Sequence, residues 1–145
     1  MRTKVVAAIC YRQRGEDVEF LLVRTKSGRK WTFPKGHIKR REREKPWEAA
    51  AREAREEAGV MGKPARSPLA HYLYRAGPSK APGEYLVAAY LLKVESQHRP
   101  EEAFRQPTWF SPRNACASLA EGGRETRYVT EHQRVLKSAL GQLKQ

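Results

Sequence analysis

Three glutamates in the first half of the chain have the spacing of a metal site. Glu53 and Glu57 are four residues apart, and Glu56 is three residues from Glu53. Residues three and four apart lie on one face of a helix, so the three carboxylates would project from neighbouring turns and could share a divalent cation. Hard oxygen ligands of this kind suit Mg²⁺ or Mn²⁺. The alternative is a solvated helix face with pairs such as Glu48 and Arg52, because charged runs usually face water.

A helix that would present these carboxylates is predicted over residues 46–58. Pro46 suits the first helical position because its missing N–H would be unpaired there, and Gly59 supplies a left-handed stop. Apolar residues recur at three- and four-residue spacing and form one narrow stripe, made of Trp47, Ala50, Ala51, Ala54 and Ala58. We expect this stripe to pack on a core, with the carboxylates beside it.

The residues around this helix extend the pattern back to Gly36. Glu44 follows Gly36, and after seven more residues comes the sequence REAREEAGV of residues 52–60. This pattern resembles the signature of the Nudix hydrolases, in which a glycine, five residues and a glutamate precede a similar helix. Here seven residues separate Gly36 from Glu44, so Glu42 offers a competing register. Because a loop absorbs two residues at little entropic cost, we favour Glu44.

The resemblance implies a role for each matched residue. Nudix hydrolases are metal-dependent enzymes that cleave phosphoanhydride bonds, which implies Mg²⁺ or Mn²⁺ as the cofactor. The implied metal ligands are the Gly36 carbonyl, Glu53, Glu56 and Glu57. Glu53 is also the implied general base, Arg52 is implied to orient a glutamate through an ion pair, and Glu44 is implied to be structural. Some relatives take a further acidic ligand from a later loop, for which Glu101 and Glu102 are candidates.

The chain is strongly basic. Its 29 lysines and arginines outnumber 16 acidic residues, and the net charge of +13 favours polyanionic partners through long-range attraction. Basic residues gather at residues 24–45, around the motif, and at residues 124–144. The predicted substrate-binding residues are Lys4, Arg24, Lys26, Lys35, Lys39 and Tyr74. The base-stacking role of Tyr74 is implied by the resemblance to Nudix enzymes that act on dinucleoside polyphosphates. The alternative is that each cation is a solvated surface charge and that Tyr74 belongs to the core.

The rest of the chain predicts an α/β domain. We expect strands at residues 4–11, 18–23, 31–33, 70–75, 84–94 and 108–110, the strand at 84–94 being central and buried on both faces. Helices are predicted at residues 113–120 and 126–143. Glycines and prolines predict irregular structure at residues 61–68 and 77–83, and residues 95–107 are expected to be a polar connection. The Nudix resemblance implies a mixed β-sheet sandwiched between the motif helix and the C-terminal helix, in one domain of residues 1–145.

Composition also excludes some classes of protein. No stretch approaches the roughly 20 apolar residues that a membrane span needs. Cys10 and Cys116 are far apart and fit no metal-binding spacing. We therefore expect a cytoplasmic protein with reduced thiols.

A highly phosphorylated small molecule suits both the resemblance and the charge. Residues 34–37, PKGH, resemble diadenosine polyphosphate hydrolases, whereas Trp31 and residues 59–62, GVMG, resemble diphosphoinositol polyphosphate phosphohydrolases. The alternatives are cleavage of a nucleoside triphosphate or ADP-ribose, and a non-catalytic Nudix-fold sensor that binds RNA or a nucleotide. The intact Glu53, Glu56 and Glu57 favour an enzyme, because crowded carboxylates repel one another unless a cation is bound.

Overall fold

The computed structural model describes residues 5–76 and 83–144, so Lys4 and most of the loop predicted at residues 77–83 lie outside it. The described chain opens with a hairpin of β1 (Val5–Arg14) and β2 (Asp17–Arg24). Gly15, with φ at 66°, takes the left-handed conformation in the turn between them. The predicted opening hairpin is confirmed.

The main path of the sheet contains both parallel and antiparallel pairs. Its order is β3 (Trp31–Thr32), β2, β1, β7 (Gly83–Gln97) and β5 (Val60–Pro64). β1 and β7 run parallel, whereas β1 with β2, β2 with β3, and β5 with β7 are antiparallel. The predicted mixed sheet is therefore confirmed.

Three more strands attach to this path. β4 (Lys35–His37) pairs with β1, β6 (Ala70–Ala76) pairs with β7, and β8 (Thr108–Phe110) pairs with β2. β7 thus pairs with β1, β5 and β6 along its length, which confirms that the apolar run at residues 84–94 is a central strand.

The central strands bury side chains on both faces of the sheet. Successive side chains of a strand point to opposite faces. In β1, one core contains Val5, Ala7 and Ile9, and the other core contains Val6, Ala8 and Cys10. Each face must therefore be covered by a layer of its own.

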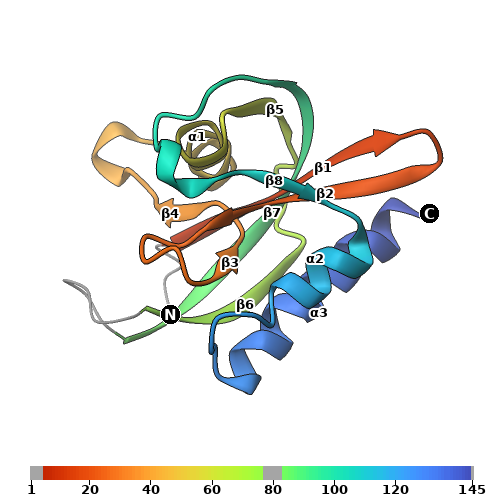
Figure 1. The fold of residues 1–145 in the computed structure, drawn as a ribbon. Helices are drawn as coiled ribbons and strands as arrows, with labels where there is room; N and C mark the ends of the chain where they lie inside the picture. The colour runs from red at the N-terminus through yellow and green to blue at the C-terminus, as the bar shows by residue number, and fades with distance from the viewer. Residues whose placement is uncertain (1–4, 77–82, 145) are drawn as a thin grey trace.

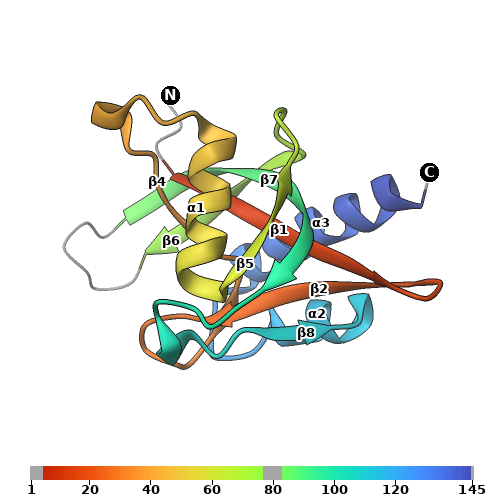
Figure 2. The ribbon, with the colours of Figure 1, turned by 90° about the horizontal axis from the view of Figure 1, so that it is seen from above.

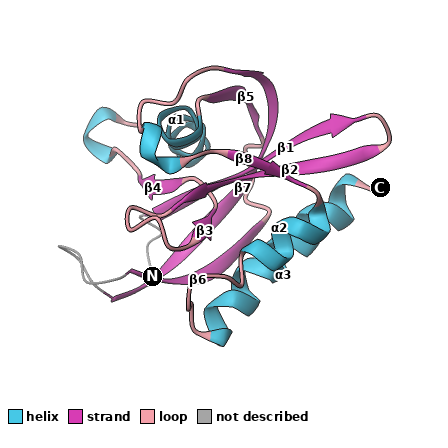
Figure 3. Cartoon of the chain, viewed as in Figure 1, coloured by secondary structure: helices cyan, strands magenta, loops and turns pink. Residues whose placement is uncertain are grey.

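Helices supply both layers, on opposite sides of the sheet (Figures 1 and 3). α1 (Pro46–Ala58) packs on one face through Ala49, Ala50, Ala54 and Ala58. α2 (Pro112–Ser118) and α3 (Thr126–Leu143) cover the other face, where Leu119, Val135, Leu136 and Ala139 join the core. The predicted sandwich and the predicted bounds of α1 and α3 are confirmed. None of the helices in the described ranges is long and apolar enough to cross a membrane.

Two segments predicted as connections are strands instead. Residues 61–64 belong to the segment that was predicted to be irregular, yet they lie in β5. Gly62 packs against the backbone of β7 where a side chain would not fit, and the register shifts between Met61 and Gly62. A glycine in a strand often marks such a close approach or a bulge. β7 also continues to Gln97, because β5 pairs with its polar end.

The connection from β4 to α1 contains the two extra residues of the motif. Arg40–Glu42 form a short 3₁₀ helix, and Arg43 follows in the left-handed conformation with φ at 57°. Figure 2 shows this connection extending past the N-terminal end of α1. β4, which was not predicted, pairs Gly36 with Val6 of β1. The longer loop therefore protrudes, and Gly36 stays in the sheet beside α1.

Candidate active site

α1 places Glu53 and Glu57 at the boundary between the sheet and solvent. The apolar stripe of the helix packs on the sheet, and Glu53 and Glu57, beside that stripe, are both buried. Their carboxyl groups share a hydrogen bond. Burial raises the pKa of Glu57 to about 8, and the nearby Glu53 carboxyl adds to that rise. Burial also raises the pKa of Glu53, although a hydrogen bond from Arg52 opposes the rise.

Arg52 connects the acidic residues of the motif. Its Nε donates to Glu44 at 2.7 Å, and its Nη1 donates to Glu53 at 2.6 Å and to Glu56 at 3.1 Å. Its Nη2 donates to the His37 carbonyl at 2.9 Å, which ties the helix to the end of β4. These bonds fix the guanidinium between three carboxylates, and they hold the Glu53 carboxylate in one orientation.

The structure favours Glu44 over Glu42 as the motif glutamate. Glu44 accepts hydrogen bonds from Arg52 and from the Lys39 N–H at 2.9 Å. Although burial opposes ionisation of Glu44, these bonds lower its pKa. The Glu42 side chain is 70% exposed and lies 4.0 Å from Lys39 in the protruding loop. Glu44 therefore belongs to the network around the active site, as the favoured register predicts.

A second arginine, Arg105, which the sequence pattern did not indicate, is buried beside Glu57. The Arg105 Nη2 is 3.6 Å from the Glu57 carboxylate, and its Nε donates to Glu102 at 3.0 Å. Its Nη1 donates to the Arg24 carbonyl at 3.1 Å. Arg105 is in the short 3₁₀ helix Ala103–Arg105, in a segment that was expected to be a polar connection. Of the two later-loop candidates, Glu102 lines the pocket beside this arginine.

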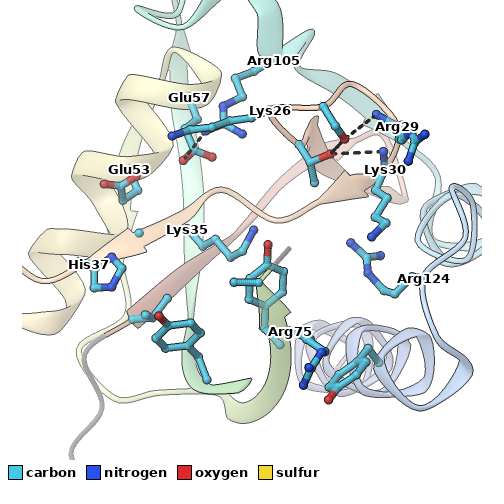
Figure 4. Close-up of a pocket in the computed structure, with 18 of the residues that line it drawn as sticks. Lys26, Arg29, Lys30, Lys35, His37, Glu53, Glu57, Arg75, Arg105 and Arg124 are labelled. Atoms are coloured by element: carbon cyan, nitrogen blue, oxygen red, sulfur yellow. Dashed lines mark hydrogen bonds and ion pairs between the residues drawn. The ribbon is translucent and has the colours of Figure 1, made fainter. Parts of the chain in front are cut away.

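The motif carboxylates open into a pocket of about 960 Å³. Figure 4 shows Glu53 and Glu57 on one side of it and Arg29, Lys30 and Arg124 on the other. The lining includes these basic side chains: Lys26, Arg29, Lys30, Lys35, Arg75, Arg105 and Arg124. It also includes Tyr74, Tyr85 and Tyr128. The pocket therefore combines a carboxylate cluster with a ring of cations.

The structure brings most of the predicted site residues into this pocket. Gly36, Glu53, Glu56, Glu57, Lys26, Lys35 and Tyr74 all line it. Lys35 lies with its Nζ 4.1 Å from the centroid of the Tyr74 ring and donates to the Thr32 hydroxyl at 3.3 Å. The lysine thus covers one face of the aromatic ring that was predicted to stack on a base.

Three predicted substrate-binding cations are not placed in the pocket. Lys4 lies outside the described residues. The Arg24 guanidinium stacks on the Trp31 ring, 3.8 Å from its centroid, and the exposed Lys39 side chain points to the protruding loop near Glu42. For these three residues a role in binding stays a prediction.

Several lining residues were not among the predicted site residues. Arg75, Tyr85, Arg105 and Tyr128 come from strands, turns and helices far apart in the chain, and no local pattern connects them. Arg124 begins the second basic cluster of the sequence, which was the available signal for it. The pocket joins that cluster to the first one, at residues 24–45.

The carboxyl groups in this pocket are chemically suited to bind a divalent cation. Within residues 5–76 and 83–144, no three His, Cys, Asp or Glu side chains are gathered closely enough to hold a metal, and the Glu56 carboxylate accepts a hydrogen bond of 3.1 Å from Arg52. Glu53 and Glu57 nevertheless form a buried pair of carboxyl groups that must share a proton or a cation to lie together. Their oxygens are the ligand type that Mg²⁺ and Mn²⁺ prefer.

Comparison with known proteins agrees with this geometry. The family model of the NUDIX domain matches residues 1–133. An Ap4A hydrolase from C. elegans, solved as a binary complex, superposes with a TM-score of 0.67 at 21% identity, over 97% of this chain and 98% of that one. A NUDIX hydrolase from Nitrosomonas europaea gives a TM-score of 0.70 at 21% identity, over 97% and 90% of the two chains.

A third similar structure contains a small-molecule ligand. The NUDIX domain of Shewanella oneidensis NrtR, solved in complex with ADP ribose, has a TM-score of 0.71 at 15% identity, over 99% of this chain and 89% of that one. At these identities the likeness of the solved structures establishes the fold, whereas the domain match extends over most of the sequence. The chain therefore belongs to the NUDIX domain family, and the predicted class, a Nudix hydrolase that acts on phosphorus-containing anhydrides, is confirmed.

Proposed function

We propose that this protein cleaves a phosphoanhydride bond in a highly phosphorylated small molecule, with Mg²⁺ or Mn²⁺ as cofactor. One observation carries the proposal: the motif carboxylates Glu53, Glu56 and Glu57 share a single pocket with seven basic side chains. Carboxylates suit a divalent cation, and clustered lysines and arginines suit phosphate oxygens. A substrate rich in phosphate would be attracted to both parts of this pocket.

Glu53 and Glu57 would hold the metal, with Glu56 and the Gly36 carbonyl as the further predicted ligands. When bound, a divalent cation neutralises charge on the phosphate oxygens and activates water for attack on phosphorus. The Glu53 and Glu57 carboxyl groups already lie together in the buried corner of the pocket. Glu56 would join them by giving up its 3.1 Å contact with Arg52.

Glu53 is the proposed general base. Its carboxylate lines the pocket, and Arg52 holds one of its oxygens at 2.6 Å. The hydrogen bonds between Arg52 and Glu44 fix that guanidinium in turn. A proton acceptor must be held in one orientation to take a proton from attacking water, and this ion-pair network supplies the orientation. Arg52 and Glu44 act as positioning residues in this account.

The cations of the pocket would bind the phosphates. Arg105 lies near Glu57 and lowers its pKa, so it is close enough to the carboxylate cluster to bind phosphates next to the scissile bond. Lys26 and Lys35 line the same pocket. We favour a diadenosine polyphosphate or a diphosphoinositol polyphosphate as the substrate, because each supplies several phosphates for several cations.

ADP-ribose is the second candidate substrate. The NrtR NUDIX domain, which has a similar fold over 99% of this chain, was solved with ADP ribose bound. ADP-ribose contains one pyrophosphate and no further phosphate, so it would leave much of the basic lining without a partner.

A panel of substrates tests the proposal. Release of phosphate or nucleotide would be measured with diadenosine polyphosphates, diphosphoinositol polyphosphates, ADP-ribose and nucleoside triphosphates, each with Mg²⁺, Mn²⁺ or chelator. We expect metal-dependent release, fastest with one of the first two classes. If the folded protein cleaves no compound of the panel with either metal, the proposed function is wrong, and salt-sensitive binding of RNA would then favour a sensor.

A further inference from the structure

Arg124 is a partly buried cation that lines the pocket on the side away from the motif helix (Figure 4). Its Nη1 donates to the Leu119 carbonyl at 2.7 Å, and its Nη2 donates to the Trp31 carbonyl at 3.1 Å. Both partners are neutral. Within the described ranges, Arg124 forms no ion pair with a carboxylate.

The two arginines that contact the carboxylates around the motif helix are neutralised. Arg52 contacts three carboxylates, and Arg105 contacts those of Glu57 and Glu102. Buried charges in proteins are normally paired, because removing a charge from water without a partner is costly. Burial in fact lowers the pKa of Arg124. A partly buried guanidinium that faces a pocket and lacks a counter-ion is suited to an anionic ligand.

Further positive charge lies in the same pocket as Arg124. The neighbouring Glu125 also lines this pocket, but it forms no ion pair with Arg124 within the described residues. Lys30 and Lys35 line the same pocket, and neither forms an ion pair in the part of the chain that the structure describes. Behind them are the buried side chains of Tyr72 and His132. Burial lowers the pKa of His132 to about 3, with Arg124 and Lys35 contributing, and burial raises the pKa of Tyr72, so both side chains are neutral at pH 7.

Backbone contacts hold these cations in place without a ligand. Gly122, with φ at 89°, packs against the Arg29 carbonyl so closely that a Cβ would overlap it. This contact joins the loop after β2 to the loop before α3. Thr25 and Lys30 close the first loop through a backbone hydrogen bond of 2.9 Å. Lys30 and Arg124 are therefore presented by two loops that fit together, which reduces the cost of ordering them on binding.

We propose that Arg124, with Lys30 and Lys35, forms a second phosphate subsite, which binds a phosphate group of the substrate that is not cleaved. The ligand class is a compound that bears a phosphate or diphosphate group outside the scissile anhydride. The guanidinium and the two ammonium groups would supply charge-assisted hydrogen bonds to a group that carries up to two negative charges. That the ligand is the substrate rests on the proposed function. That an anion binds here rests on the partial burial of Arg124 beside the pocket without a carboxylate partner.

Calorimetric titration with inorganic tripolyphosphate in metal-free buffer tests the subsite without catalysis. We expect Arg124→Met and Lys30→Met each to raise the Kd for tripolyphosphate about 10-fold, the usual effect of losing a charged hydrogen-bond partner. Arg113→Met is the matched control, because Arg113 is exposed on α2 and does not line the pocket. It removes one positive charge and should change Kd less than about 2-fold, since an exposed charge contributes little.

Folding and specificity are controlled in the same experiment. Arg124 donates to two backbone carbonyls, so we expect Arg124→Met to lower Tm. Lys30→Met removes no side-chain hydrogen bond within the described residues, so it keeps the test valid if Arg124→Met fails to fold. If Lys30→Met and every folded Arg124 variant bind tripolyphosphate with the wild-type Kd, the proposed subsite is wrong. It is also wrong if Arg113→Met loses as much affinity as they do, because binding would then follow net charge alone.

Kinetics separate this inference from the proposed function. With a substrate that has phosphates beyond the scissile bond, Arg124→Lys and Lys30→Met should raise KM and leave kcat within about 2-fold, as expected for an interaction made equally in the ground and transition states. If these variants are active and their KM equals that of the wild type, the subsite is contradicted but the proposed function is not. If the wild type hydrolyses no substrate, the proposed function is contradicted, whereas the Kd for tripolyphosphate still tests whether Arg124 binds an anion.

Discussion

The Glu53 carboxyl group packs against Gly36 so closely that no Cβ fits between them. Gly36 is held in β4 opposite Val6, and Glu53 is held on α1 by Arg52. The contact therefore joins the two parts of the motif, and it explains why a glycine is required at residue 36. The backbone conformation of Gly36 is not left-handed, so a glycine is required because the Glu53 carboxyl group leaves no room for a side chain.

Gly36→Ala should displace the Glu53 carboxylate and lower kcat. A misplacement of about 1 Å at a catalytic group can cost up to about 100-fold, and we expect a loss of about 10-fold to 100-fold with the fold preserved. The measurement is kcat on the best substrate of the panel, with circular dichroism as a check on folding.

Gly141→Ala is the matched control for this substitution. Gly141 lies in α3, and a Cβ there would meet nothing within 4 Å. Alanine in a helix should raise the free energy of unfolding by about 0.5–1 kcal/mol and leave kcat unchanged. Equal kcat values for the two variants would show that the contact between residues 36 and 53 does not matter for turnover.

Arg105 should stabilise the fold as well as the active site. Arg105→Gln would leave Glu57 without its 3.6 Å cationic partner and the Arg24 carbonyl without a donor. We expect the free energy of unfolding to fall by about 1–3 kcal/mol in metal-free protein, measured by urea denaturation. Arg127→Gln breaks an exposed pair with Glu84 and should cost less than about 1 kcal/mol. An Arg105→Gln protein as stable as the Arg127→Gln protein would refute this role.

The Glu57 carboxyl should make the stability of the metal-free protein depend on pH. Its pKa is raised from 4.5 to about 8 by burial, so the folded state holds a proton that the unfolded state releases. Between these values unfolding releases protons, and the free energy of unfolding must therefore fall as pH rises from about 4.5 through about 8. Other groups titrate too, so the prediction concerns the difference between wild type and Glu57→Gln.

We expect that difference to change by about 3–4 kcal/mol between pH 5 and pH 8, with Glu57→Gln the less pH-dependent protein. Added Mg²⁺ should reduce the dependence in the wild type, because binding to the ionised carboxylates stabilises the folded state most at high pH. Denaturation curves at pH 5 and pH 8 measure both effects. Parallel pH profiles for wild type and variant would show that Glu57 does not titrate in this range.

Local signals predicted the helices and the carboxylate cluster. Pro46 and Gly59 mark the ends of α1, and both bounds agree with the structure. The glutamates at three- and four-residue spacing do line one pocket. β5 was missed because Gly62 and Pro64 favour turns in isolation, whereas pairing with the edge of β7 makes the segment a strand. Tertiary pairing overrode local preference there.

The basic part of the pocket could be predicted only in part. Lys26 and Lys35 are near the motif in the sequence, and both line the pocket. Arg105 reaches it from the 3₁₀ helix Ala103–Arg105, and Arg124 reaches it from the loop before α3. The basic cluster at residues 124–144 indicated a charge at Arg124, but no local pattern placed either arginine beside the motif. Charge showed that a polyanion suits the chain, and the fold shows which cations face the motif carboxylates.

The central claim is that Glu53 and Glu57 carry out metal-dependent hydrolysis, and the most direct test is turnover by Glu53→Gln and Glu57→Gln at saturating Mg²⁺. Each substitution keeps the size of the side chain and removes its charge. We predict a loss of about 100-fold or more in kcat for both variants, with the fold intact, since a general base alone contributes about 10²-fold to 10⁴-fold. Near-wild-type kcat in both folded variants would contradict the account.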